Sequence, residues 1–166
     1  MKTTRKGFTL IELIVVIAII GVLAAILVPA MLGWVKKSKI QAANADAKTI
    51  MTNINAGLEE MDEEGIDPLA DNWYDNNVSA DEATDWDTVL EYASYYGDTV
   101  RSGRYSVWVK EGVAVACVAK SGKYYGTFPA VLTNKNYEDK MSSNTLSCAK
   151  GVAESEYTAA HSTKSS

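Results

Sequence analysis

The feature that most restricts the fold of this chain is a long apolar run near its amino terminus. The run covers 28 residues, 8–35, and only Thr9 and Glu12 interrupt it with polar side chains. As an α-helix it would span roughly 42 Å at ~1.5 Å per residue, which is enough to cross a bilayer. The basic residues before it favour a cytoplasmic location for the extreme amino terminus. A purely soluble cytosolic protein is therefore excluded.

The segment before the run differs from an ordinary secretory signal. Such a signal places a small-residue cleavage site after its apolar stretch, and no convincing site of that kind precedes a polar start here. Instead, Gly7 separates a basic leader, residues 1–7, from the apolar run. Cleavage at this point would leave the apolar helix on the mature protein. Outside the membrane, other copies of the same helix would have to cover it.

The junction KGFTLIE, residues 6–12, followed by the long apolar run, closely resembles the class III signal of type IV pilins and related pseudopilins. The resemblance covers residues 2–40. It implies cleavage between Gly7 and Phe8 by a membrane prepilin peptidase, followed by N-methylation of the new Phe8 amine. Glu12 matches the acidic residue at the fifth mature position of this family.

Glu12 supports the same interpretation on physical grounds. A carboxylate in an apolar helix is costly in hydrocarbon, and such residues are functional by default. We expect Glu12 to pair with the freed Phe8 ammonium of a neighbouring subunit, because opposite charges attract strongly in a low-dielectric core. The alternative is a polar residue near the helix end that reaches the lipid headgroups.

Gly21 and Pro29 match helix-weakening positions that recur in major pilins. Proline removes one backbone hydrogen bond, and glycine weakens a helix further. The resemblance implies a segment that unwinds when the helix packs into a fibre. The alternative is a mild kink of the kind that membrane helices tolerate.

Residues 36–64 follow a lysine cluster and change from uniformly apolar to amphipathic. Apolar residues recur there at steps of three and four, which predicts one stripe on a continuing helix. The stripe consists of Ile40, Ala43, Ala47, Ile50, Ile54, Leu58 and Met61. Gly65, followed by Pro68, is the expected stop, giving one helix of roughly 55 residues. We expect a β-sheet to cover the stripe, in preference to a coiled-coil seam or a cofactor face.

Residues 104–128 carry three strand patterns separated by short turns, which predicts an antiparallel meander. The strands are expected at Arg104–Lys110, Val113–Lys120 and Lys123–Phe128, with turns at Glu111-Gly112 and Ser121-Gly122. The apolar face of the first strand would consist of Tyr105, Val107 and Val109. The predicted fold class is therefore α+β: a long N-terminal α-helix, half transmembrane and half amphipathic, packed on a small antiparallel β-sheet, as in type IV pilins.

Cys117 lies in the expected middle strand and Cys148 in the C-terminal segment, residues 129–166. An exported chain permits a disulfide, and closing this loop would contribute about 3–4 kcal/mol in the chain-entropy model. The bridge would tie the segment to the sheet, similar to the disulfide-bounded C-terminal region of many pilins. The alternative is a pair of free buried thiols. We expect residues 151–166 to fray, with His161 as a surface residue.

Residues 65–103 form the expected loop between helix and sheet, and the acidic residues concentrate around it. Residues 49–100 hold fourteen Asp and Glu and no Lys or Arg, whereas the segments on both sides are net basic. This block repels phosphate and disfavours a basic nucleic-acid binder. The capping-box spacing of residues 79–82 predicts a short helix that continues to about Tyr95. Its inner face would consist of Ala83, Trp86, Leu90 and Ala93.

Several functions compete for this acidic loop. Clustered carboxylates suggest calcium, although their spacing does not match an EF-hand. Exposed aromatic residues suggest stacking on glycan rings, with Trp73, Tyr74 and Trp86 as candidates, and packed aromatic residues suggest electron transfer. The simplest interpretation is a solvated acidic face whose aromatic residues belong to the core. Residues 77–79 also fit a glycosylation sequon, a motif that recurs by chance.

The first functional hypothesis is a structural subunit, the major pilin of a type IV pilus, which serves adhesion, twitching motility or DNA uptake. The second is a type II secretion pseudopilin, but residues 140–166 hold too few acids for the calcium site of the major pseudopilin. The third is a surface adhesin or carbohydrate-binding pilin. An enzyme, a metal site and a cofactor are not expected, because the chain lacks a histidine near a nucleophile, a phosphate loop and metal-ligand spacing.

The expected partners are other copies of the chain in a helical fibre, prepilin peptidase and the pilus assembly machinery in the membrane. Without its leader the chain has 13 basic and 21 acidic residues, so direct nucleic-acid binding is not expected. The precursor would lie in the inner membrane and the mature chain in an extracellular pilus on the bacterial cell surface. In a fibre, the acidic loop would face the basic C-terminal region or the lysine cluster of a neighbour, and high salt would loosen this contact.

Overall fold

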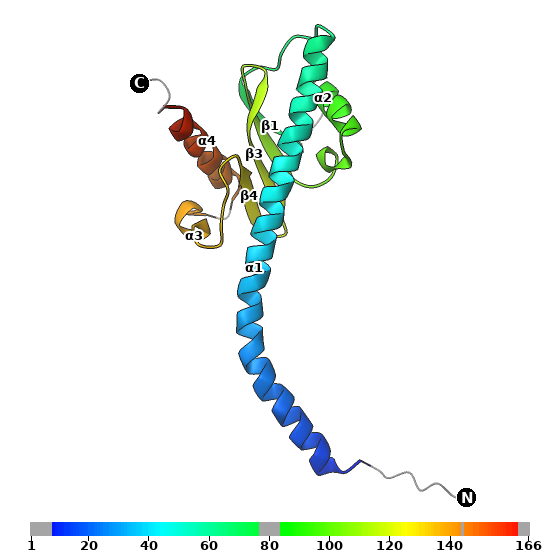
Figure 1. The fold of residues 1–166 in the computed structure, drawn as a ribbon, viewed down its shortest axis with the longest axis vertical. Coiled ribbons are helices and arrows are strands. Elements are labelled where there is room, and N and C mark those ends of the chain that lie inside the picture. Colours follow the sequence, from blue (N-terminus) through cyan, green and yellow to red (C-terminus); the bar gives the residue numbers. More distant parts are fainter. Residues whose placement is uncertain (1–7, 77–83, 144, 163–166) are drawn as a thin grey trace, which may run out of the picture. The chain divides into compact units, whose positions relative to one another are not determined.

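The chain divides into two compact units, residues 1–36 and 37–166. The computed structural model describes residues 8–76, 84–143 and 145–162. Helix α1, Leu10–Glu63, contributes to both units (Figure 1). We call the second unit the head.

The described part of the first unit is the apolar half of α1 and the two residues before it. Its large apolar side chains are all exposed, from 45% for Val16 to 78% for Phe8. Among the described residues, α1 is the one helix long and apolar enough to cross a membrane, with a mean hydropathy of 3.2 over 18 residues. The described residues therefore leave the apolar surface of this unit uncovered.

Helix α1 ends where the sequence predicts. Gly65 has a left-handed conformation, with φ +74°, and its N–H donates to the Asp62 carbonyl at 3.1 Å. The Ile66 N–H reaches back to the Met61 carbonyl at 3.0 Å. These two bonds form a Schellman motif, which satisfies carbonyls that the last helical turn leaves unpaired. The predicted stop at Gly65 is confirmed.

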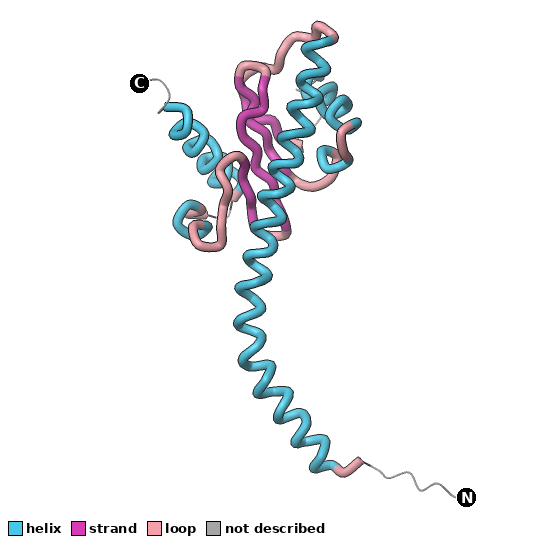
Figure 2. The backbone as a smooth tube through the Cα atoms, viewed as in Figure 1, coloured by secondary structure: helices cyan, strands magenta, loops and turns pink. Residues whose placement is uncertain are grey.

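Four antiparallel strands form the sheet of the head in the order β1-β2-β3-β4 (Figure 2). The strands are β1, Asn72–Asp75; β2, Tyr105–Lys110; β3, Val113–Ser121; and β4, Tyr124–Phe128. The predicted meander of three strands and the predicted α+β fold are therefore confirmed. Strand β1 is an addition, because the acidic loop carries no strand in the sequence prediction.

The two hairpin turns differ in how well the sequence locates them. Glu111 and Gly112 have φ angles of 53° and 76°, as a type I′ turn requires, and this turn is confirmed. The next turn consists of Gly122 and Lys123, because Ser121 pairs with Tyr124 as the last residue of β3. The second turn therefore lies one residue later than predicted.

The inner face of the sheet and the part of the α1 stripe from Ala47 to Met61 form the main core, whereas Ile40 belongs to the second cluster. All seven predicted stripe residues of α1 are buried. The predicted face of β2, Tyr105, Val107 and Val109, belongs to this inner cluster, together with Cys117 and Ala119 of β3. Because side chains alternate along a strand, Ala116 and Val118 belong to a second, outer cluster.

Strand β4 approaches α1 so closely that one position accepts only glycine. A Cβ on Gly126 would collide with the backbone of Ala43 and Asn44. Asn44 is buried at this contact, where its Oδ1 accepts from the Thr127 N–H at 3.0 Å and its Nδ2 donates to the Leu132 carbonyl at 2.6 Å. One side-chain amide thus satisfies two backbone groups beside the edge strand.

The outer face of the sheet is covered by helix α4, Leu146–Ser162 (Figure 1). The prediction that residues 151–166 fray is wrong for their described part. Ala149 and Ala153 are one turn apart and fully buried in the outer cluster, where small side chains allow a close approach to β3. Lys150 adds an ion pair with Asp75 of β1 at 2.9 Å. Docking on the sheet therefore stabilises a helix in a segment whose composition does not by itself predict one.

Of the remaining helices, two lie between β1 and β2 in the sequence and one follows β4. They are α2, Thr84–Tyr95; η1, a 3-10 turn at Asp98–Val100; and α3, Tyr137–Lys140. The predicted helix in the acidic loop is confirmed by α2, in which Trp86 and Ala93 are buried and Leu90 is half-buried. Its predicted start at residues 79–82, with Ala83, and the sequon at residues 77–79 lie outside the described residues.

Helix α2 packs directly on α1. A Cβ on Gly57 would lie 2.8 Å from the Ala93 nitrogen, so the two backbones are close. The Tyr92 hydroxyl donates to the Glu64 carboxylate at 2.5 Å, and this bond raises the pKa of Tyr92 to about 12. These contacts place a dense group of carboxylates at the end of α1.

Candidate functional site

The amino-terminal end of α1 forms a capping box. Oε2 of Glu12 accepts from the Thr9 N–H at 2.9 Å and from the Thr9 hydroxyl at 2.7 Å, and the Glu12 N–H lies 3.4 Å from Thr9 Oγ1. Such bonds satisfy N–H groups that the first turn of a helix leaves unpaired. Glu12 therefore stabilises the helix start within one chain, in addition to its predicted role between subunits. The Thr-x-x-Glu spacing before an apolar run is the sequence signal for this role.

The predicted processing site lies just before this capping box in the sequence, and the predicted unwinding segment lies after it. Phe8 is exposed immediately before it, whereas Gly7 lies outside the described residues. Helix α1 continues through both Gly21 and Pro29. Cleavage before Phe8 and unwinding between Gly21 and Pro29 both stay predictions.

The three aromatic candidates for surface recognition separate in the structure. Trp86 is 2% exposed and belongs to the inner core, so the prediction of surface recognition is wrong for this residue. Tyr74 stacks on Trp86 with ring centroids 4.9 Å apart and packs against the same core. Trp73 points to the other face of β1, because successive side chains of a strand alternate. Only Trp73 therefore belongs to the outer face.

Trp73 is part of an aromatic row on the outer face that the sequence prediction missed. It stacks on Trp108 of β2 with centroids 6.0 Å apart and planes 14° apart. Trp108 and Tyr157 form a T-shaped contact with ring centroids 5.4 Å apart. Tyr157 stacks on His161 at 4.1 Å. The alternation of β2 places Trp108 on the outer face, but its partners depend on the docking of β1 and α4.

The expected disulfide is absent, because Cys117 and Cys148 are both free thiols. Cys117 belongs to the inner cluster, whereas Cys148, in the first turn of α4, packs against the outer cluster. The sheet lies between the two, so a bridge would require β3 or α4 to move. Burial raises the pKa of the Cys117 thiol, whereas hydrogen bonds, first from the Ser143 backbone and then from the Ser142 side chain, lower the pKa of Cys148.

Among the described residues, no group of three or more His, Cys, Asp or Glu side chains is arranged to hold a metal ion. The acidic residues of the head are most frequent at the end of α1 and in the segment that follows it, up to α2.

Comparison with known proteins points to one family. A family model described as the prokaryotic N-terminal methylation motif matches residues 2–28. The chain is 36% identical over 78 residues to the type IV major fimbrial protein FimA of Dichelobacter nodosus, covering 47% of this chain and 48% of that protein. It is 33% identical over 121 residues to a fimbrial protein of Neisseria meningitidis serogroup A, covering 73% and 59%. It is 46% identical over 56 residues to the type IV major alpha-pilin of Moraxella bovis, covering 34% and 35%.

The chain spans about half the length of the first two of these relatives, 48% and 59%. No solved structure matches it. The methylation motif, the named relatives and the long helix packed on an antiparallel sheet nevertheless agree with one another. The chain belongs to the type IV pilin family and carries a class III amino-terminal signal.

Proposed function

We propose that this chain is the major structural subunit of a type IV pilus. Prepilin peptidase would cleave the precursor between Gly7 and Phe8, and the mature chain would polymerise through its apolar helix. The observation that carries this proposal is the exposed apolar half of α1, with one carboxylate near its start. Outside a membrane, such a surface is stable only where other apolar surfaces cover it, and copies of the same helix provide that cover.

Within the fibre, Glu12 would keep its capping role and also neutralise the Phe8 ammonium of a neighbouring subunit. Both hydrogen bonds from Thr9 end on Oε2, and Oε1 accepts none from the described residues. Oε1 is therefore available as an acceptor for a second chain. A carboxylate and an ammonium buried together attract strongly, whereas either alone is costly, so this pair would set the axial register.

The location and partners follow from the same proposal. The precursor would lie in the inner membrane, because α1 is long and apolar enough to cross it. The peptidase and the membrane assembly machinery would act on it there, and the fibre would extend from the cell surface. Non-catalytic function is part of the proposal, since the chain would act by assembly. The segment between Gly21 and Pro29 would unwind as subunits pack.

The test compares two variants of the capping box in cells that produce the chain. Glu12→Gln removes the charge but keeps a side chain that a capping box accepts, whereas Thr9→Ala weakens the cap and keeps the charge. Sheared surface fibres are counted by electron microscopy, and mass spectrometry identifies the amino terminus. We expect fibres from the wild type and from Thr9→Ala, with N-methylated Phe8 as the first residue, and few from Glu12→Gln.

Two results would contradict the proposal. A mature chain that still begins at Met1, or the absence of fibres from the wild type, excludes a processed pilin. Normal fibres from Glu12→Gln exclude the charge pair and leave Glu12 with the capping role alone. The same images distinguish a long pilus from the short piston of a secretion pseudopilin.

A glycan-binding surface pilin is a second candidate function, favoured by the aromatic row on the outer face. Trp73 and Trp108 are half-buried and nearly parallel, and Lys150 lies 5.3 Å from the Trp73 ring centroid. Half-buried indole rings with polar groups beside them suit a sugar surface. Fibres of the Trp73→Ala variant should bind immobilised glycans more weakly than wild-type fibres. Fibres of the Trp86→Phe variant should bind as the wild type does, because Trp86 lies in the core. Equal binding by all fibres would exclude this function.

A further inference from the structure

The head has an acidic groove where α1 ends and the β2–β3 turn folds beside it. The groove has a volume of about 490 Å³. Its apolar floor contains Leu58, Met61 and Leu69, and carboxylates at its rim come from Glu59, Asp62 and Glu111. We use the name acidic groove for this site.

The rim carboxylates are not neutralised within the chain. Among the described residues, the carboxylates of Glu59, Asp62 and Glu111 have no hydrogen-bond or ion-pair partner. By contrast, the nearby Glu60 and Glu64 accept hydrogen bonds from Tyr96 and Tyr92, each at 2.5 Å. Since residues 49–100 contain no Lys or Arg, the groove favours a cation from outside.

The chemistry of the groove favours a lysine side chain over a metal ion. No three acidic or other ligating side chains among the described residues are arranged to hold a metal. A lysine has an aliphatic stem that suits the apolar floor and an ammonium that can reach rim carboxylates. Val113, at one wall, is 52% exposed and would extend the apolar contact.

The chain presents exposed lysines at the opposite end of the head. Lys37 and Lys39 are exposed in the first turn of α1 that belongs to the head. Lys37 and Glu59 are separated by roughly 33 Å along the helix at ~1.5 Å per residue. A rigid helix therefore prevents one chain from joining its own lysines to its own groove.

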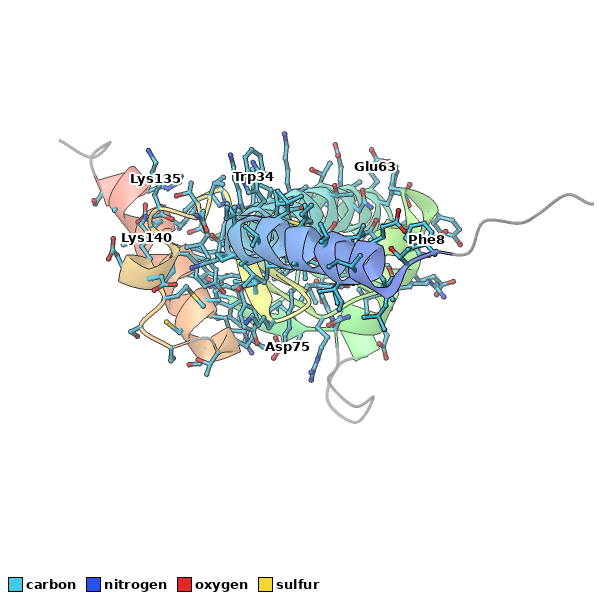
Figure 3. The ribbon with its side chains drawn as sticks, turned by 90° about the horizontal axis from the view of Figure 1, so that it is seen from below. Phe8, Trp34, Glu63, Asp75, Lys135 and Lys140 are labelled. Carbon is cyan, nitrogen blue, oxygen red and sulfur yellow. The ribbon has the colours of Figure 1, made fainter. Side chains whose placement is uncertain are left out.

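In the view from below in Figure 3, Lys135 and Lys140 lie on one side of the head and Glu63 lies toward the other. Lys37 and Lys39 are thus separated from the acidic groove by the length of the helix between them. Two complementary surfaces at opposite ends of one body make a heterologous, head-to-tail contact, and repetition of such a contact generates a ring or a helical filament.

We propose that the acidic groove of one subunit binds Lys37 and Lys39 of a second copy of this chain. The inference rests on the proposed pilus function and adds a contact between heads to the packing of the apolar helices. The lysine stems would lie on Ile66 and Val113, the more exposed apolar residues of the groove, and the ammonium groups would pair with Glu59 and Asp62. The contact gives the concentration of acidic charge at the end of α1 a role in assembly.

The first test is zero-length crosslinking of intact sheared fibres with a carbodiimide, which joins an ammonium to a carboxylate in direct contact. Fibres grown from a mixture of isotopically light and heavy chains distinguish crosslinks between copies from crosslinks within one. We expect mixed-isotope peptides that join Lys37 or Lys39 to Glu59, Asp62 or Glu111.

The second test reverses charges on the helix surface. Glu59→Lys with Asp62→Lys should lower fibre yield roughly tenfold or more, because like charges would meet at the contact. Adding Lys37→Glu and Lys39→Glu should restore the yield. The matched control, Asp139→Lys with Glu154→Lys, changes net charge equally at exposed sites away from the groove and should assemble as the wild type does. Circular dichroism and membrane fractionation verify that each variant folds and inserts.

The outcomes separate this inference from the proposed function. If wild-type fibres form but their crosslinks avoid the groove, the inference is wrong and the pilus proposal stands. The same holds if the first reversal assembles normally or the fourfold reversal fails to restore fibres while each chain folds and inserts. If the wild type forms no fibres, the pilus proposal fails and the contact fails with it.

Discussion

Replacement of Gly126 by alanine tests the close contact between β4 and α1. The new Cβ would collide with the backbone of Ala43 and Asn44, and backbone cannot move aside as the end of a flexible side chain can. The strand and the helix must therefore separate. Separation also breaks the two hydrogen bonds that Asn44 makes across the contact.

The magnitude follows from these two effects. Overpacking a well-filled core costs about 1–3 kcal/mol. Loss of two buried hydrogen bonds costs about 1 kcal/mol each. Gly126→Ala should therefore lower the free energy of unfolding by about 3–5 kcal/mol, a large part of the ~5–15 kcal/mol typical of a folded domain.

The assay is urea unfolding of the full chain in mild detergent, followed by tryptophan fluorescence, because three of the four tryptophans lie in the head. Gly151→Ala in α4 is the matched control. Outside the adjoining backbone of its own helix, no heavy atom of the described residues lies within 4 Å of the position its Cβ would take. This variant should gain about 0.5–1 kcal/mol, since alanine is the better helix former.

A Gly126→Ala chain that unfolds within about 0.5 kcal/mol of the wild type would refute the close contact. If Gly126→Ala does not accumulate, Asn44→Ala tests the same contact without a collision. It leaves the Thr127 N–H and the Leu132 carbonyl unpaired, at about 1–3 kcal/mol for each buried group. Wild-type stability of that variant would contradict the structure equally.

Three further predictions test other parts of the head. Ala153→Leu should lower the free energy of unfolding by about 1–3 kcal/mol, because Ala153 is fully buried on the face of α4 that packs on the sheet. Ala159→Leu, on the exposed side of that helix, should not, and equal unfolding curves for the two variants would show that α4 does not dock. Iodoacetamide should label Cys148 in the native chain but should label the buried Cys117 only after denaturation. Peptide mass spectrometry identifies the labelled residues, and labelling of neither thiol in the absence of a reductant would instead indicate a disulfide. Ultraviolet absorbance should show Tyr92 ionising at a pKa of about 12, because its hydrogen bond to Glu64 favours the protonated form, and Glu64→Gln should return the pKa toward 10. Because folding raises the pKa of Tyr92, the stabilisation from its hydrogen bond to Glu64 is present below pH 10 and is lost as the pH approaches 12.

The sequence by itself determined the parts of the fold whose signals are local. The steps of three and four along α1 identify its buried stripe, and Gly65 marks its end through a left-handed conformation that glycine readily adopts. The alternation of β2 and the Glu111-Gly112 turn identify the meander. The amino-terminal signal has the same local character, since KGFTLIE and the apolar run are contiguous.

The candidate assembly site was only partly predictable. The sequence singles out Glu12 as the carboxylate of the apolar helix, while the structure adds its hydrogen bonds to Thr9. The Thr-x-x-Glu signal for that cap is local and was open to prediction. The acidic groove was not, because its rim joins α1 to a hairpin turn about fifty positions later in the chain.

Only the tertiary structure decided the features that depend on distant contacts. Strand β1 is four residues with polar ends, too short to be recognised before it pairs with β2. Helix α4 forms on the outer face through Ala149 and Ala153, and its position keeps Cys148 apart from Cys117. Trp86 lies in the core and Trp108 in the outer row for the same reason. Local sequence specifies a backbone conformation and its apolar side, but burial depends on which other segment covers that side.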